Sequence, residues 1–377
     1  MSSPEQPAQP ALRVVAIGGG TGLSTLLRGL KRYVPAPAAA RRATDTAPRR
    51  ASGTPATLGR RATDLPARPP AETHAQELPC LIRDLAAIVT VTDDGGSSGR
   101  LRGDFKMLPP GDVRNCMVAL SEDEHLLAKL VQYRFDQGDL EGHSFGNLFV
   151  AALSNITGDF AQAVQMSSQI LATRGRIYPA TNTNVTLAAR MDDGSLVRGE
   201  TSITASPHRI LELMLDPADA EPLPGALDAI ANADLITIGP GSLYTSLITN
   251  LLVRGIPEAL AASKATRVYV ANLMTQANES LGLTAAQHIE KIMQHCGTAA
   301  APIFDYALIN IAPISPTLLR QYEHEGQTPI EADLDRIRSL GVEPITGNFA
   351  HEGNVLRHDP DRVTEALLKL GLGRLGL

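Results

Sequence analysis

The sequence predicts an α/β fold in which helices cover both faces of a mostly parallel central sheet. Short β-branched or aliphatic runs alternate with segments whose apolar residues recur at helical spacing, as in strand–helix–strand units. Several of the apolar runs end directly in glycine-rich or polar loops. The length of 377 residues allows one large α/β unit with smaller additions.

The elements are expected in a regular order along the chain. A strand at Arg13–Ile17 precedes a helix with Leu23, Leu26, Leu27 and Leu30 on one face. Asp192–Gly194 reads as the turn of a hairpin within 183–204, inside a helical and hairpin insertion at about 157–215. Further strands are expected at Cys80–Val91 and within 234–246, 267–276 and 304–315, and further helices at Val113–Leu120, Glu122–Arg134, Gly146–Ile156, Asp159–Thr173, Pro224–Ala233, 284–296 and 315–326.

Two segments are expected to be disordered: the tail 1–11 and an insertion at 35–79, which interrupts a single domain spanning 12–377. The insertion holds eight prolines, seven arginines and four acidic residues, a net charge of +3, and hardly any large apolar residue. Such a composition buries too little surface to offset the entropy of ordering. The string RRATD occurs in it twice, which fits either slippage in low-complexity DNA or a Ser/Thr kinase site at Thr44 or Thr63.

Composition limits the class of protein. The formal charge of −6, the pI near 5.9, an aromatic content of 4% and the lack of Trp argue against a nucleic-acid binder. Three widely spaced cysteines, Cys80, Cys116 and Cys296, fit reduced thiols. We expect neither a signal peptide nor a membrane span, and therefore a cytoplasmic protein. A homo-oligomer is compatible with the sequence.

Four strands end in loops that could carry chemistry. These loops are Gly18–Gly22, Asp93–Gly99, Gly239–Ser242, and the stretch holding Asn272, Thr275 and Gln276. Parallel strands bring their carboxyl ends to one edge of the sheet, which is where open α/β sheets bind ligands. A single loop of this kind is often only a tight turn, whereas four at one edge point to a ligand.

The loop GGGTG is the first candidate for binding phosphate. Gly18, Gly19, Gly20 and Gly22 let backbone N–H groups approach an anion, Thr21 adds a hydroxyl, and a helix N-terminus follows. The third glycine of the dinucleotide fingerprint is replaced by a leucine, and the Gly-Lys-Ser/Thr of a P-loop is missing. The loop is therefore compatible with a nucleotide, but it matches neither the standard NAD-binding fingerprint nor a P-loop.

The run TDDGGSSGRLR is the second candidate. Asp93 and Asp94 could accept hydrogen bonds from ribose or base, hold Mg²⁺, or act catalytically. The same side chains could instead cap a helix and pair with the arginines. The remaining candidate ligand-binding residues of this run are Gly95, Gly96, Ser97, Ser98 and Arg100.

Two further stretches are more ambiguous. Asp112, in LPPGDVRN, is a third catalytic candidate, but it equally fits a helix N-cap. GHSFGN carries His143 and the candidate ligand residue Asn147, and a lone histidine is more often structural than catalytic. No metal-ligand spacing such as HExxH or CxxC occurs.

The combination of VVAIGGGTGLSTLLRGLK, DDGGSSGRLR, PPGDVRN, GHSFGN, GPGSLYTS and NLMTQ resembles the gluconeogenesis factor (YvcK) branch of the CofD-like family. The resemblance covers nearly the whole chain outside 1–11 and 35–79. It implies a Rossmann-like three-layer α/β/α core. It also implies that Tyr322 and Arg357 contact a nucleotide-sugar. Gly239, Gly241, Ser242 and Asn272, in the loops at the carboxyl edge, are further candidate ligand-binding residues. The chain departs from the family pattern in its insertion, in the loop 275–280 and at Thr249.

The resemblance implies one of two functions. The first is a cytoplasmic UDP-sugar-binding regulator of cell shape and envelope precursor balance on gluconeogenic carbon sources, with UDP-N-acetylglucosamine as a ligand. The alternative is a Mg²⁺-dependent 2-phospho-L-lactate transferase-like enzyme that uses a nucleoside-diphosphate donor.

Overall fold

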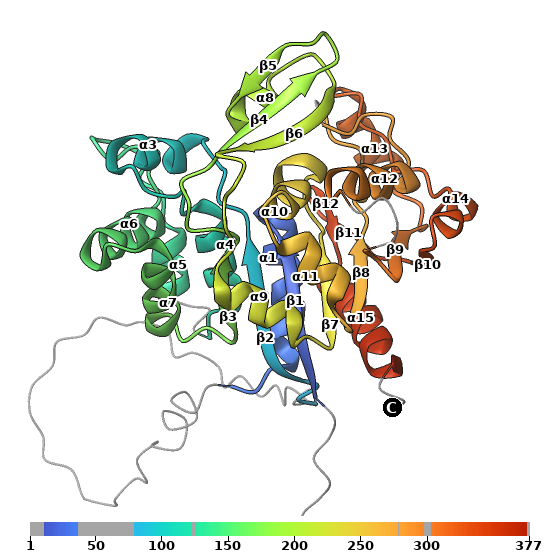
Figure 1. The fold of residues 1–377 in the computed structure, drawn as a ribbon, viewed down its shortest axis with the longest axis horizontal. Helices are drawn as coiled ribbons and strands as arrows, with labels where there is room; N and C mark the ends of the chain where they lie inside the picture. The colour runs from blue at the N-terminus through green and yellow to red at the C-terminus, as the bar shows by residue number, and fades with distance from the viewer. Residues whose placement is uncertain (1–10, 37–78, 123–125, 278, 298–302, 375–377) are drawn as a thin grey trace, which may run out of the picture.

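The central sheet has seven strands, and all of its strand pairs are parallel (Figure 1). The computed structural model describes residues 11–36, 79–122, 126–277, 279–297 and 303–374. From one edge to the other the strands are β10 (Glu343–Gly347), β9 (Tyr306–Asn310), β8 (Thr266–Val270), β7 (Leu235–Ile238), β1 (Leu12–Gly18), β2 (Ile82–Val89) and β3 (Arg176–Pro179). The predicted fold class is thereby confirmed.

The middle strands are apolar along almost their whole length because helices cover both faces. Val14–Ile17, Leu85–Val89 and Leu235–Ile238 are all buried. This continuous apolar pattern is why the sequence identified them as strands.

The strand order reverses beside β1. From β1 the chain adds β2 and β3 on one side, and it then returns to place β7, β8, β9 and β10 on the other side. A crevice at the carboxyl ends of β1 and β7 follows from such a reversal.

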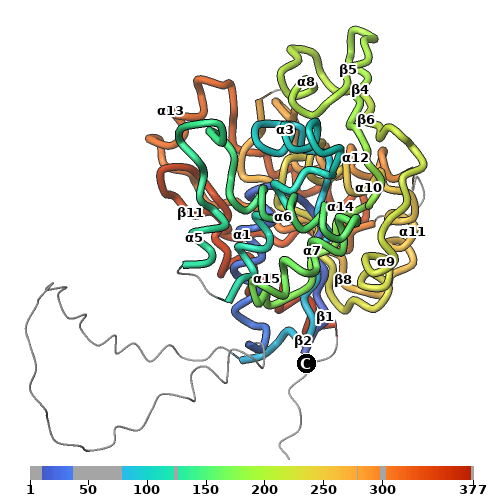
Figure 2. Tube along the Cα trace, turned by 90° about the vertical axis from the view of Figure 1, so that its left-hand side faces the viewer, coloured from blue at the N-terminus to red at the C-terminus, as the bar shows by residue number. Residues whose placement is uncertain are grey.

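Helices form layers on the two faces of the sheet (Figures 1 and 2). On one face α1 packs between α4 and α15. On the other face α9 and α11 lie in front of the strands in Figure 1. The bounds of these helices are α1 Gly20–Leu30, α4 Gly111–Leu120, α9 Pro224–Ala231, α11 Ile256–Ala262 and α15 Pro360–Arg374.

Further helices and helical turns surround this core. A group at the side of β3 consists of α3 (Gly96–Phe105), α5 (Leu126–Gln132), α6 (Phe145–Thr157) and α7 (Phe160–Ile170). The others are η1 (Lys31–Tyr33), η2 (Leu243–Ile248), α10 (Thr249–Leu251), α12 (Ala285–His295), α13 (Pro316–Glu323) and α14 (Leu334–Ser339).

A small antiparallel sheet stands above the carboxyl edge, at the top of Figure 1. It contains β4 (Thr186–Met191), β5 (Leu196–Arg198) and β6 (Ile210–Asp216), and the hairpin turn is where the sequence predicted it. The stretch Glu200–Thr204, predicted as part of the hairpin, instead forms helix α8. β3, inside the predicted insertion 157–215, pairs with β2 and so belongs to the main sheet.

The C-terminal region adds a second small apolar cluster. Leu273 and Met274, after β8, pack with Ile314 and Leu318. Tyr322 and the hairpin formed by β11 (Ala350–Glu352) and β12 (Leu356–His358) pack on this cluster. The cluster therefore holds α13 and the last hairpin beside the carboxyl edge.

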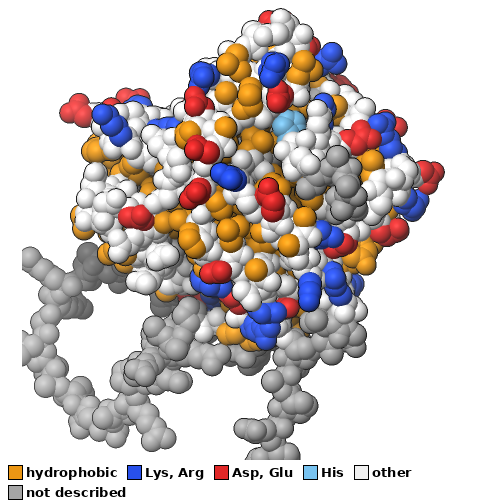
Figure 3. All heavy atoms as spheres, viewed as in Figure 1, with side chains coloured by type: hydrophobic (Ala, Val, Ile, Leu, Met, Phe, Trp, Pro, Cys, Tyr) orange, Lys and Arg blue, Asp and Glu red, His pale blue; other side chains and the backbone are white. Residues whose placement is uncertain are grey.

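Acidic and basic side chains are interspersed on the face of the molecule shown in Figure 3. In the part of the chain that the structure describes, no helix has the length and apolar character needed to cross a bilayer. Most of the segment 35–79, including Thr44 and Thr63, lies outside the described residues.

The contact between α1 and α15 gives a test of core packing. A Cβ added at Gly29 would lie 2.3 Å from the Thr364 hydroxyl and 2.4 Å from the Pro360 carbonyl oxygen. We expect Gly29→Ala to lower the free energy of unfolding by about 1–3 kcal/mol, because the two helices must move apart.

Thermal unfolding of the variant measures this effect. Gly373→Ala, in the same helix pair, is the control, because no atom lies within 4 Å of the added Cβ. It should be neutral or stabilise by up to about 1 kcal/mol. Equal melting temperatures for the two variants would contradict the packing described.

Candidate functional site

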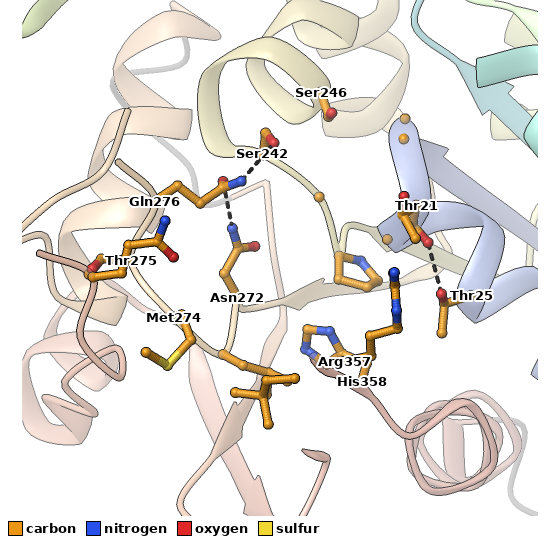
Figure 4. Close-up of a pocket in the computed structure, with 18 of the residues that line it drawn as sticks. Thr21, Thr25, Ser242, Ser246, Asn272, Met274, Thr275, Gln276, Arg357 and His358 are labelled. Carbon is orange, nitrogen blue, oxygen red and sulfur yellow. Dashed lines mark hydrogen bonds between the residues drawn. The ribbon is translucent and has the colours of Figure 1, made fainter. Parts of the chain in front are cut away.

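A cavity of about 330 Å³ lies where β1 and β7 end. Three of the four predicted loops contribute to it (Figure 4). Its lining consists of Gly19, Gly20, Thr21, Gly22, Thr25, Pro240, Gly241, Ser242, Ser246, Asn272, Leu273, Met274, Thr275, Gln276, Tyr322, Gln327, Leu356, Arg357 and His358. Residues from the start, the middle and the end of the chain thus meet at the reversal of strand order.

The two glycine loops touch through their backbones. A Cβ added at Gly22 would lie 2.4 Å from the carbonyl oxygen of Pro240, so only glycine allows this approach. The fully buried Asn250 links the first loop to η2, the helical turn that follows the second loop, because its amide nitrogen donates to the carbonyls of Gly18, at 3.0 Å, and Ser246, at 2.6 Å. Gly18 and Gly239 lie just behind the lining and end β1 and β7.

The N-terminus of α1 opens into the cavity. Gly19 precedes the helix without a side-chain cap, and the first turn carries no acidic residue. Of the first N–H groups, that of Gly20 donates to the carboxylate of Asp112. The N–H groups of Thr21 and Gly22 are the donors left for an anion at this end of the helix.

The N-terminus of η2 is occupied by a carboxylate of the protein itself. Glu279 accepts hydrogen bonds from the Tyr244 N–H, at 3.2 Å, and the Thr245 hydroxyl, at 2.9 Å. Burial raises the pKa of this carboxyl. Gly241 and Ser242 therefore line the cavity, but the helical donors behind them are already used.

Side-chain amides and one cation form the opposite wall. Gln276 donates to the Ser242 hydroxyl at 3.0 Å and accepts from the Asn272 amide at 3.3 Å (Figure 4). Arg357 is the only charged side chain among the lining residues that the structure describes. The Tyr322 hydroxyl accepts the Leu356 N–H at 2.9 Å, which leaves its own proton free to donate.

His358 lies beside Arg357 in the cavity (Figure 4). Burial lowers its pKa to about 4, so the ring is neutral near pH 7. Sequence analysis missed this residue, as it missed Gln327, because neither belongs to a pattern that a single sequence reveals.

The predicted residues of the second glycine run lie outside the lining. Gly95 and Gly96 begin α3, so part of the predicted loop 93–99 is a helix. The Ser97 hydroxyl lies 3.1 Å from His143 Nδ1, Ser98 is buried beside Gly111, and Arg100 donates to the Glu141 carbonyl at 2.8 Å. Asn147 is buried in α6, and its Oδ1 has no partner among the described residues.

The three candidate aspartates lie outside the cavity lining, next to Gly19 or to α8. Asp94 accepts hydrogen bonds from the N–H and the hydroxyl of Thr201, at 2.8 and 2.6 Å, and so anchors α8. Asp93 accepts the Gly95 N–H at 2.9 Å. Asp112 lies beside Gly19, and burial raises its pKa to about 6.

These carboxylates do not form a ready site for Mg²⁺. Among the described residues, no group of three histidine, cysteine or acidic side chains is placed to hold a metal ion. Asp94 is already committed to Thr201. A Mg²⁺ ion at Asp93 and Asp94 stays a prediction.

Asn250 provides a test of how the cavity is held together. We expect Asn250→Ala to lower the free energy of unfolding by about 1–3 kcal/mol, because the Gly18 and Ser246 carbonyls each lose a hydrogen bond. The Gly18 carbonyl keeps the one that it accepts from the Thr90 N–H. Chemical denaturation measures the loss. The control is Asn232→Ala, because Asn232 is exposed and donates only to the Asp228 carbonyl; a loss of equal size there would contradict the role of Asn250.

Glu200 provides a test of the buried charge near the aspartates. Burial, with the negative charges of Asp93 and Asp112, raises its pKa to about 8, and the Thr92 hydroxyl contacts it at 3.1 Å. The folded protein therefore binds a proton that the unfolded chain releases above about pH 4.5. The contribution of this group to the free energy of unfolding is greatest below that pH, and it is lost as the pH rises to about 8.

We expect Glu200→Gln to be more stable than the natural protein at pH 8.5, by about 2 kcal/mol, and the difference to shrink toward pH 5. Denaturation curves across this range measure it. Glu323→Gln, on the exposed side of α13, is the control and should leave the pH dependence unchanged. A difference that does not vary with pH would show that Glu200 is ionised in the fold.

Comparison with known proteins identifies the family. Residues 14–350 match the family model described as 2-phospho-L-lactate transferase CofD. The gluconeogenesis factor of Halalkalibacterium halodurans is 43% identical over 94% of this chain and 95% of its own. That of Bacillus subtilis is 41% identical over 95% of this chain and 98% of its own.

A solved structure agrees with this relationship. The crystal structure of a member of the UPF0052 family from Bacillus halodurans has a TM-score of 0.80 and 42% sequence identity. It covers 96% of this chain and 100% of its own. The chain belongs to the CofD family, and its similar relatives include proteins named gluconeogenesis factor.

Proposed function

We propose that this protein binds a nucleoside-diphosphate sugar, with UDP-N-acetylglucosamine as the first candidate, in the cavity at the ends of β1 and β7. In this proposal the bound protein acts in the cytoplasm as a regulator of cell shape and envelope precursor balance on gluconeogenic carbon sources. The observation that carries the proposal is the pairing of the α1 N-terminus with Arg357 in one cavity.

The two features suit a diphosphate. The free N–H groups of Thr21 and Gly22 favour an anion at the positive end of the helix dipole. Arg357 supplies a guanidinium, which binds phosphate oxygens through paired hydrogen bonds. No carboxylate stands among the described lining residues to repel the ligand.

The remaining polar groups suit a nucleoside and a sugar. The amides of Asn272 and Gln276 can both donate and accept, as base edges require. Tyr322 offers an aromatic ring and a free hydroxyl proton. Leu273, Met274 and Leu356 add apolar surface.

A second candidate function is transfer of a phosphate-containing group. It is favoured by the description of the matching family model and by the position of Asp112 directly behind Gly19. Asp93, Asp94 and Asp112 are not part of the cavity lining, so a reacting group must extend past Gly19 to reach them.

A thermal-shift titration tests the binding function. UDP-N-acetylglucosamine at 100 times its dissociation constant should stabilise the fold by about 2.7 kcal/mol. Arg357→Ala should weaken binding at least about tenfold, because a hydrogen bond to a charged group is lost. Arg320→Ala, exposed on α13 and outside the lining, is the matched control and should bind like the natural protein.

Two outcomes would contradict the proposal. Stabilisation by GDP or NAD but not by UDP-sugars would exclude the UDP-sugar. Formation of product from a deazaflavin acceptor and a phospholactyl donor, lost in Asp93→Asn, would favour the transferase.

A further inference from the structure

The imidazole of His358 is fixed in one tautomer by the main chain. Nε2 lies 3.0 Å from the carbonyl oxygen of Ala271, at the end of β8. A carbonyl can only accept, so the hydrogen is on Nε2. In a neutral imidazole the other nitrogen, Nδ1, is then an acceptor without a hydrogen.

The second nitrogen is not closed off from solvent. Nδ1 has no hydrogen-bond partner among the described residues, and it is not one of the fully buried polar atoms that lack a partner. His358 lines only the cavity at β1 and β7 among the hollows described. The acceptor is therefore available to a molecule bound there.

His288 shows what a structural histidine looks like in the same protein. Its Nδ1 lies 2.8 Å from the Thr284 carbonyl oxygen, so it too is tied to the backbone by one nitrogen. Its remaining nitrogen, Nε2, is fully buried without a partner, and the whole side chain is 0% exposed. The two histidines differ in that the free nitrogen of His358 is not fully buried and its side chain lines a cavity.

We infer that His358 is a specificity-determining residue, whose Nδ1 accepts a hydrogen bond from a hydroxyl or N–H group of the ligand. This inference rests on the proposed binding of a nucleoside-diphosphate sugar. It adds that the cavity selects for the sugar, ribose or base and not for the diphosphate alone.

The reason lies in the direction of the hydrogen bonds. The N–H groups of α1 and the guanidinium of Arg357 are donors, which suit phosphate oxygens. Diphosphate oxygens that are ionised have no hydrogen to give to Nδ1. The two ionisable oxygens of a diphosphate diester are both charged near pH 7. An acceptor beside Arg357 therefore gains nothing from dimethyl pyrophosphate, and it gains a bond from a neighbouring hydroxyl or N–H group.

Two substitutions separate this role from a structural one. In His358→Gln the side-chain amide can keep the bond to the Ala271 carbonyl, but nothing replaces the Nδ1 acceptor. In His358→Asn the amide oxygen can take the place of Nδ1, while the bond to Ala271 is lost. His351→Gln, exposed on β11 opposite Arg357, is the matched control.

Calorimetric titration with UDP-N-acetylglucosamine and with dimethyl pyrophosphate, which has no hydrogen to donate near pH 7, is the experiment. His358→Gln should weaken the binding of UDP-N-acetylglucosamine about five- to fiftyfold, as expected for one lost hydrogen bond, and should leave the affinity for dimethyl pyrophosphate unchanged. His358→Asn should recover part of the loss, and His351→Gln should bind like the natural protein.

The outcomes that overturn the inference are distinct. Equal affinity of the natural protein and His358→Gln for UDP-N-acetylglucosamine overturns the inference and leaves the proposed function standing. An equal loss of affinity for both ligands in His358→Gln overturns it in favour of a structural role. Failure of the natural protein to bind UDP-N-acetylglucosamine overturns the proposed function as well.

A measurement on the natural protein covers the case in which the variants do not fold. In ¹⁵N NMR spectra, Nδ1 of His358 should carry no proton, and its signal should move on addition of UDP-N-acetylglucosamine but not of dimethyl pyrophosphate. A protonated Nδ1, or a signal that does not respond to UDP-N-acetylglucosamine, overturns the inference.

Discussion

The candidate site depends on one constraint, the contact between two backbones at the reversal of strand order. β1 and β7 are neighbours although more than 200 residues separate them, and their following loops meet where Gly22 faces the Pro240 carbonyl. Asn250 strengthens this meeting by bonding to the Gly18 carbonyl in the first loop and to the Ser246 carbonyl in η2, which follows the second loop. The direction of α1, and with it the position of its free N–H groups, follows from that contact.

The second wall is held by different forces. Leu273 and Met274 pack with Ile314 and Leu318, and this apolar cluster positions Tyr322 and the β11–β12 hairpin. Hydrogen bonds then refine the placement, from Leu356 N–H to the Tyr322 hydroxyl and from His358 to the Ala271 carbonyl. The backbone N–H groups at the start of α1 thus form one wall of the cavity, and the side chains held by the apolar cluster form the other.

The sequence allowed the sheet and most of one wall to be predicted, because buried parallel strands and glycine loops are local patterns. It misplaced Glu200–Thr204, whose two Thr and one Ile are residues that favour strands. It also took the start of α3 for a loop, because glycine and serine form helices poorly. Tyr322 and Arg357 came only from family resemblance. His358 could not be predicted, since its role depends on which of its two nitrogens the backbone of a distant strand engages.

The cavity draws its walls from residues 19–25 at one end of the chain and 322–358 at the other, and α15 then covers α1. During synthesis on the ribosome the N-terminal part is made first, at roughly 5–20 residues per second. The glycine loops therefore exist for some time without Arg357 or His358, and α1 without its outer neighbour. In the proposed function, the complete cavity therefore becomes available to a ligand only after residues 357 and 358 have been made.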